Sequence, residues 1–210
     1  MSPRAASRET RSLVGWAVAS RPHPGEYVSG DRGVVQPFPE GVLLAVLDGI
    51  GHGAQAAEAS RIAAEYLERH AHESVISIVN GCHEVLSGTR GTALTVASLN
   101  ALNDTLTWLS VGNVEGQLLR ARAAPRGAKD STLLRGGIVG SQLPPLKEAV
   151  LPVSPGDLLV FATDGVAHGF EEGLAPGDPP QKLADEILRR HCKGTDDALV
   201  LVARYLGSPR

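Results

Sequence analysis

The chain has 210 residues, of which 42% are hydrophobic and 20% charged, and its formal net charge is −3 at pH 7. This length suits one well-packed domain, and the slightly acidic charge argues against nucleic acid or an anionic membrane as a partner. No apolar run approaches the roughly 18 residues that cross a bilayer. The first ten residues lack the apolar segment of a signal peptide. We therefore expect a cytoplasmic protein in which residues 1–10 are flexible and residues 11–210 form a single domain.

The first part of the chain predicts two strands followed by two helices. Leu13 to Ser20 has the composition of a strand, and Gly41 to Asp48 is a short apolar run typical of a strand buried on both faces. From Gly53 to about His72 the apolar residues recur at helical spacing. A second helix is expected from Ser74 to Leu86, with its first residue as the N-cap. Gly81 inside this helix costs about 1 kcal/mol relative to alanine.

The middle of the chain is rich in segments that look like strands. They are Ala93 to Leu99, Thr105 to Val111 and Gln117 to Arg120. The residue pairs Asn103-Asp104 and Gly112-Asn113 provide turns between them. This pattern predicts an antiparallel meander of three strands.

The last part of the chain predicts further strands and one more helix. The expected elements are short strands at Thr132 to Leu134 and Glu148 to Leu151, a buried strand from Leu158 to Thr163, a helix from Gln181 to His191 and a final strand from Ala198 to Ala203. Strands and helices do not alternate regularly along the chain. The order therefore predicts the α+β class, with largely antiparallel sheets and helices packed outside them.

Acidic residues recur at the ends of the expected buried strands. Asp48 and Asp164 each end such a strand, Asp31 follows a loop, and Asp196 and Asp197 precede the last strand. Any one of them alone is explained as a turn or strand-end cap. If the strand ends meet, however, the carboxylates repel one another and require positive charge. A divalent cation is the simplest source, and ligands that are all oxygen favour magnesium or manganese over zinc.

The glycines that follow Asp48 allow a rival interpretation. Gly49, Gly51 and Ala54 satisfy the G-x-G-x-x-[GA] pattern of dinucleotide-binding loops, between a strand and a helix. That fold places an acidic residue about 20 positions later, at the end of a second strand, whereas this chain is still helical near Arg69. The Asp48 carboxylate would also repel a pyrophosphate. Both points count against a dinucleotide-dependent oxidoreductase.

Four segments together resemble the signature motifs of the metal-dependent PPM serine/threonine phosphatases, and more closely those of the bacterial SpoIIE-like branch. They are Ser29-Gly30-Asp31, Asp48-Gly49-Ile50-Gly51-His52-Gly53, Thr163-Asp164-Gly165 and Asp196-Asp197. These segments extend over nearly the whole chain. Within the branch, the compact length and the segment from Ser110 to Gly116 are most similar to the stressosome phosphatases.

The resemblance implies a central antiparallel β-sandwich flanked by α-helices on both sides, with a site for two divalent cations, Mn²⁺ or Mg²⁺. Asp48 would bridge both ions, and the Gly49 carbonyl would bind one of them. Asp164 and Asp196 would hold the other ion, while Asp31 would act at the first ion directly or through water. Asp48 and Asp164 would be the catalytic residues, because the metals would activate a bound water for attack on the phosphate.

The choice between the two acids before the last strand also rests on the resemblance. Asp196 is preferred to Asp197 because the family's ligand is the first acid before that strand. The glycines of the second segment then have local reasons, since Gly51 and Gly53 permit a tight turn from strand to helix.

Two features of larger family members have no clear counterpart here. Those relatives carry a histidine directly after the Asp-Gly pair as a proposed general acid, whereas this chain has Ile50 in that place. His52 lies two residues later, and we interpret it as structural. The phosphate-binding arginine of larger relatives is not evident either, and Arg32 and Arg90 are weak candidates.

By the same resemblance, the expected substrates are phosphorylated scaffold or antagonist proteins of the stressosome. Their dephosphorylation would reset a bacterial stress response. The protein is expected to be a monomer. A non-catalytic module of the same fold that binds phosphoproteins is the main alternative, although every expected acid is present.

Overall fold

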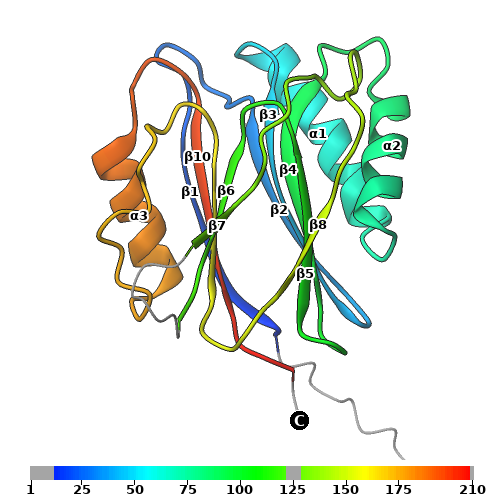
Figure 1. Cartoon of the computed structure of the whole chain (residues 1–210). Helices are drawn as coiled ribbons and strands as arrows, with labels where there is room; N and C mark the ends of the chain where they lie inside the picture. Colours follow the sequence, from blue (N-terminus) through cyan, green and yellow to red (C-terminus); the bar gives the residue numbers. More distant parts are fainter. Residues whose placement is uncertain (1–11, 122–128, 209–210) are drawn as a thin grey trace, which may run out of the picture.

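The chain folds into two five-stranded antiparallel sheets that face each other, with helices on both outer surfaces (Figure 1). The computed structural model describes residues 12–121 and 129–208. In one sheet the order is β1 (Val14–Arg21), β10 (Ala198–Tyr205), β9 (Leu158–Ala162), β6 (Glu115–Leu119) and β7 (Lys129–Ser131). In the other it is β2 (Asp31–Phe38), β3 (Gly41–Gly49), β4 (Thr92–Asn100), β5 (Thr105–Val111) and β8 (Ala149–Pro152). The helices are α1 (Ala54–Arg69), α2 (Val75–Val85) and α3 (Pro180–His191).

This architecture confirms the predicted α+β sandwich with helices on both sides. The predicted flexible segment 1–10 lies outside the described residues, and the single domain over residues 11–210 stays a prediction. Among the helices of the described ranges, none is both long and apolar enough to span a bilayer.

The inner faces of the two sheets form one of the hydrophobic cores. Leu44 and Val46 of β3 belong to the same buried cluster as Phe161 of β9 and Leu201 of β10. The alternate side chains of these strands point outward and pack under the helices. Because each of these central strands is buried on both faces, its sequence is a continuous apolar run rather than an alternating one.

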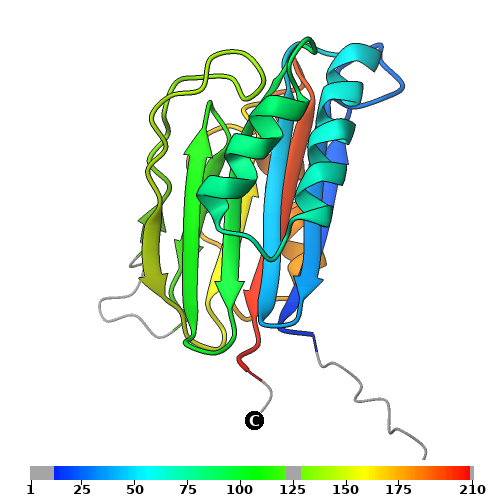
Figure 2. The ribbon, with the colours of Figure 1, turned by 90° about the vertical axis from the view of Figure 1, so that its right-hand side faces the viewer.

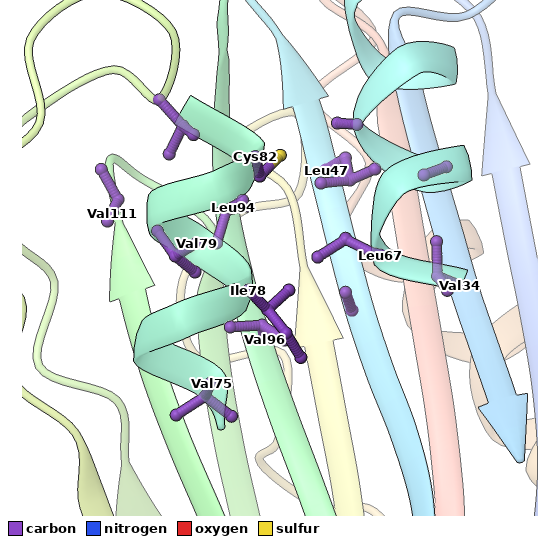
Figure 3. Packing of buried hydrophobic residues seen from close by; sticks show 14 of the residues in the cluster. Val34, Leu47, Leu67, Val75, Ile78, Val79, Cys82, Leu94, Val96 and Val111 are labelled. Atoms are coloured by element: carbon purple, nitrogen blue, oxygen red, sulfur yellow. The ribbon is translucent and has the colours of Figure 1, made fainter. Parts of the chain in front are cut away.

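Helices α1 and α2 cover the outer face of the sheet that contains β3 (Figure 2). Figure 3 shows Ile78 and Val79 of α2 packed with Leu94 and Val96 of β4, while Leu67 of α1 lies in the same cluster. Helix α3 covers the outer face of the other sheet, against β1 and β10. The apolar faces that the helical spacing predicts are therefore the faces turned toward the sheets.

Two details of α2 connect its sequence to its packing. The Ser77 N–H donates to Ser74 Oγ at 3.2 Å, so Ser74 is the predicted N-cap. A Cβ built on Gly81 would lie 1.8 Å from the hydroxyl oxygen of Tyr66 in α1. The glycine that weakens α2 locally is therefore the residue that leaves room for the Tyr66 side chain between the two helices.

The predicted strands differ from the structure in three places. Strand β2 is not predicted, because Gly33 and Pro37 interrupt its apolar pattern; the proline is tolerated because β2 is an edge strand. The predicted meander is wrong at its second turn, since the link through Gly112 and Asn113 carries the chain from β5 in one sheet to β6 in the other. Strand β7 covers residues 129–131 rather than 132–134 and pairs with β6.

Candidate active site

Acidic residues from both sheets meet at one end of the sandwich, the end opposite the β2–β3 hairpin in Figure 1. Asp31 begins β2 and lies directly opposite Asp48 near the end of β3 in the antiparallel register. Both residues share the sheet face that turns toward the other sheet, as Val46 does. The Thr163 hydroxyl, just after β9, donates to Asp31 Oδ2 at 2.7 Å. This hydrogen bond joins the two sheets at the site and brings Asp164 beside it.

Burial and neighbouring carboxylates raise the pKa values of two aspartates at this end. Burial raises the pKa of Asp31 to about 8, and the neighbouring Asp48 charge raises it further, against the opposing effect of the Thr163 hydrogen bond. Burial also raises the pKa of Asp48 to about 7, together with the charges of Asp164 and Asp196. These shifts place Asp48 and Asp164 within electrostatic reach of Asp31, and Asp164 and Asp196 within electrostatic reach of Asp48.

This donor set fits hard divalent cations. The side chains offer only carboxylate oxygens, which suit Mg²⁺ or Mn²⁺, and their mutual repulsion would be relieved by positive charge. Within residues 12–121 and 129–208, no group of three or more acidic, histidine or cysteine side chains already has the arrangement of a metal site. A cation would therefore have to draw the carboxylates closer together.

Asp196 and Asp197 lie in different environments. Asp197 is buried, and its two oxygens accept the His23 N–H at 2.7 Å and the Gly30 N–H at 2.9 Å. Its carboxylate is thus occupied in holding the loop that leads into Asp31. Asp196 is only half-buried and accepts the Asp197 N–H through one oxygen. These contacts favour Asp196 over Asp197 as the ligand.

The glycine turn after Asp48 has the conformation that its residues predict. Gly51 and Gly53 have φ angles of 87° and 75°, in the left-handed region that favours glycine. A Cβ built on Gly49 would lie 2.2 Å from the Ala56 carbonyl oxygen in the first turn of α1. Glycine at position 49 therefore lets α1 pack tightly against the end of β3, and the role of its carbonyl as a ligand stays a prediction.

His52 contacts the neighbouring loop rather than the carboxylates. Its Nδ1 lies 2.8 Å from Glu26 Oε1, and its ring stacks on His23 with 4.4 Å between the centroids. These contacts fasten loop 22–30 to the glycine turn, which supports a structural role for His52.

One residue of this end was not predicted as part of the site. Asn113 donates from Nδ2 to Asp164 Oδ2 at 2.7 Å. The sequence marks it only as a turn residue, because the approach to Asp164 depends on the crossing between sheets that the predicted meander lacks. Asn113 also lies close enough to Asp48 to lower the pKa of that carboxyl.

The two candidate arginines lie in different places. Arg32 is the next residue along β2 from Asp31, so its side chain leaves the sheet on the opposite face from the carboxylates. Arg90 lies in the loop between α2 and β4 and approaches the glycine turn at Gly51. Only Arg90 is therefore next to the acidic end of the sandwich.

The dinucleotide-binding interpretation disagrees with the strand pairing. It requires a parallel strand after the helix that follows the glycines. Strand β3 instead pairs antiparallel with β2 on one side and with β4 on the other. No strand pair among the described residues is parallel.

The fold and the site define the class of protein. Facing antiparallel sheets with outer helices form the fold of the PPM phosphatases. Residues 39–206 match the family described as stage II sporulation protein E, SpoIIE. The chain therefore belongs to the SpoIIE family, the branch of the PPM phosphatases that its motifs resemble.

Similar proteins agree with this assignment. The phosphoserine phosphatase RsbX of Bacillus subtilis (strain 168) is 27% identical over 181 residues, which cover 86% of this chain and 89% of RsbX. A solved chain of the bacterial stressosome, a modular system adapted to control secondary messenger signalling, is 28% identical; the match covers 92% of this chain and all of that one, with a TM-score of 0.81. RsbX in complex with magnesium has a TM-score of 0.80 at 22% identity, covering 91% of this chain and 94% of its own, and this likeness shows the fold.

Proposed function

We propose that this chain is a metal-dependent protein serine/threonine phosphatase that hydrolyses phosphoserine or phosphothreonine on bacterial stress-response regulators in the cytoplasm. The observation that carries the proposal is the convergence of Asp31, Asp48, Asp164 and Asp196 at one end of the sandwich, where burial and neighbouring carboxylates raise the pKa values of Asp31 and Asp48. The similarity to the phosphoserine phosphatase RsbX supports the reaction. The RsbX complex with magnesium supports a divalent cation.

The carboxylates would hold two cations, Mn²⁺ or Mg²⁺. Asp48 lies on the face of its sheet that turns toward the other sheet and would contact both ions, with Asp31 and the Gly49 carbonyl at one ion and Asp164 and Asp196 at the other. When bound, such ions supply an activated water for attack on phosphorus and neutralise the phosphoryl oxygens. Asp48 and Asp31 must lose their protons before they bind, so cations and protons compete at this site.

The residues around the carboxylates hold them in place. Asn113 orients Asp164 through its amide, and Asp197 fixes Gly30, the residue before Asp31. Partners of this kind change metal affinity or activity by about 10–100-fold in metal enzymes. We assign Asn113 and Asp197 as positioning residues, and we assign no general acid, because His52 contacts Glu26 instead.

The proposed partners are phosphorylated scaffold or antagonist proteins of a stressosome, and the chain acts on them as a monomer. The similarity to a solved stressosome chain and to RsbX supports this class of substrate. A non-catalytic phosphoprotein-binding module would keep the fold and bind the same partners without turnover.

The test is removal of phosphate from a phosphorylated stressosome antagonist protein, followed by intact-mass measurement with Mn²⁺ and with a chelator. We expect metal-dependent loss of the phosphoryl group by the unchanged protein, and activity at background for Asp48→Ala and Asp164→Ala. Asp185→Ala is the matched control, because Asp185 is an exposed acid of α3 that bonds only Gln181 among the described residues. Binding without turnover would identify a module, and full activity of Asp48→Ala would refute the assigned site.

A further inference from the structure

Arg90 lies directly against the glycine turn that follows Asp48. A Cβ built on Gly51 would be 2.6 Å from Arg90 Nη1, so the guanidinium occupies the space that a side chain at position 51 would fill. The Ile50 N–H donates to the Gly91 carbonyl at 3.1 Å, which ties the two loops together beside this contact. The arginine side chain thus reaches the turn because that turn carries no side chain at position 51.

The backbone that carries Arg90 is fixed relative to Asp48. The Thr89 hydroxyl donates to the Leu86 carbonyl at 2.7 Å, and the Gly91 N–H donates to the Thr89 oxygen at 3.0 Å. Two residues after Arg90, the Thr92 hydroxyl donates to the Asp48 carbonyl at 2.8 Å. These bonds place the Cα of Arg90 at a defined position beside the end of β3, and only the exposed side chain retains rotational freedom.

The Arg90 guanidinium has no protein partner within the described part of the chain. There it makes neither a salt bridge nor a hydrogen bond, whereas Arg61 and Arg120 each pair with two acids. A second cation at this end, Lys193, is already engaged, because its Nζ donates to the Asp164 carbonyl at 2.6 Å. Arg90 therefore offers an unpaired positive charge beside the turn that follows Asp48, where it can attract a phosphate dianion.

We propose that Arg90 binds the phosphoryl group of the phosphorylated substrate. A guanidinium presents parallel N–H donors that match two phosphate oxygens, which a lysine ammonium cannot do. The proposal rests on the proposed phosphatase function, and it assigns the anion-binding role to the loop between α2 and β4. Gly51 serves this role by leaving the space over the turn to the guanidinium.

Arg32 provides a matched control for the charge of Arg90. It is also an exposed arginine, and it follows Asp31 directly in the chain. Its side chain leaves β2 on the face opposite the carboxylates. Replacing Arg32 therefore removes the same charge from the molecule without changing the groups that face the site.

The experiment measures the KM and kcat of the full chain on a phosphoserine peptide, the inhibition by inorganic phosphate, and Mn²⁺ binding by calorimetry. For Arg90→Ala we expect the KM and the phosphate inhibition constant to rise about 10–100-fold, as for loss of a charge-assisted hydrogen bond, with Mn²⁺ affinity unchanged. Arg90→Lys should fall between Arg90→Ala and the unchanged protein, and Arg32→Ala should match the latter.

The outcomes separate this proposal from the function on which it rests. Unchanged KM and phosphate inhibition in Arg90→Ala would refute the role of Arg90 while the phosphatase function stands. A loss of Mn²⁺ affinity as large as the rise in KM would also refute it, because it would indicate a structural role. If the unchanged protein hydrolyses no phosphopeptide, the proposed function fails. Calorimetric binding of inorganic phosphate to the Mn²⁺-loaded protein then still decides whether Arg90 holds the anion.

Discussion

Asp196 and Asp197 are adjacent in the chain, yet their contacts assign them to different tasks. Asp197 is buried and accepts two backbone N–H groups from loop 22–30. Within the described ranges, Asp196 accepts only the Asp197 N–H. The sequence shows two acids before a strand but does not show which of them is the ligand and which is structural. The distinction depends on where His23 and Gly30 lie in the folded chain.

We predict that Asp197→Ala mainly lowers the stability of the fold, whereas Asp196→Ala mainly lowers the affinity for Mn²⁺. Asp197→Ala leaves the buried Gly30 N–H and the part-buried His23 N–H unpaired. Each costs about 1–3 kcal/mol, so the free energy of unfolding in urea should fall by roughly 2–6 kcal/mol. Asp196→Ala should change that free energy by less than about 1 kcal/mol and should abolish tight Mn²⁺ binding in calorimetry. If Asp197→Ala abolished Mn²⁺ binding and Asp196→Ala lowered the stability, Asp197 would be the metal ligand and Asp196 the structural acid.

For individual residues, the sequence predicts the acids of the site better than the residues that hold those acids in place. Asp48 and Asp164 are recognisable because each ends an apolar run and precedes a glycine, and Asp31 because it follows a glycine at the end of a loop. Asn113 is not, because its amide reaches Asp164 from another strand connection. Charges near buried strands thus carry a local signal, whereas a neutral side chain that orients them carries none.

At the scale of elements, periodicity finds the buried strands and helices but not their sheets. The link between β5 and β6 has the turn residues of a hairpin, yet the Thr95 and Ser110 hydroxyls both donate to the Val114 carbonyl as the chain crosses. Gly112, with φ of 92°, turns the backbone at this crossing. A local pattern specifies a turn but not the sheet to which the next strand belongs.

At the contact between α1 and α2, packing and helix propensity predict opposite effects of replacing Gly81 with alanine. Gly81→Ala should gain about 1 kcal/mol from propensity alone. The added methyl would instead meet the Tyr66 ring and hydroxyl, and such overpacking costs about 1–3 kcal/mol. We therefore expect a net loss of stability of up to about 2 kcal/mol in urea unfolding.

Two further variants test the cause of that loss. In a Tyr66→Ala background the clash is removed, so Gly81→Ala should no longer destabilise the protein. Gly15→Ala on β1 is the matched control, because a Cβ at that position meets no atom within 4 Å. A stabilising effect of Gly81→Ala in the unchanged background would show that Tyr66 moves aside at little cost.

At the scale of the molecule, the site lies where the two sheets meet, so repulsion between its carboxylates affects the stability of the fold. Asp31 and Asp48 come from one sheet and Asp164 and Asp196 from the other, and the Thr163 hydrogen bond to Asp31 joins them. Without cations, these carboxylates repel one another across the sandwich. The order of apolar runs predicts antiparallel sheets with helices outside, and the family resemblance implies the sandwich, whereas this coupling requires the actual approach of the strand ends.

The coupling predicts a pH dependence for the metal-free protein. Asp31 and Asp48 have pKa values of about 8 and about 7 in the folded state, raised by burial and by neighbouring carboxylates from an ordinary 3.8. Above about pH 4 the unfolded chain releases these protons while the folded chain keeps them. The stability that these groups contribute is therefore present at low pH and is lost as the pH rises toward 8.

Urea unfolding in a chelator at pH 5 and pH 8 measures this effect. Asn at position 48 is neutral at every pH, so Asp48→Asn should lose less stability than the unchanged protein between the two values. Mn²⁺ should stabilise the unchanged protein most at pH 8, where the carboxylates are ready to bind, and should have little effect on Asp48→Asn. The exposed Asp185→Asn control should follow the unchanged protein. If stability changed with pH in the same way for Asp48→Asn and for the unchanged protein, the Asp48 charge would not destabilise the fold. A cation would then have no repulsion to relieve between the sheets.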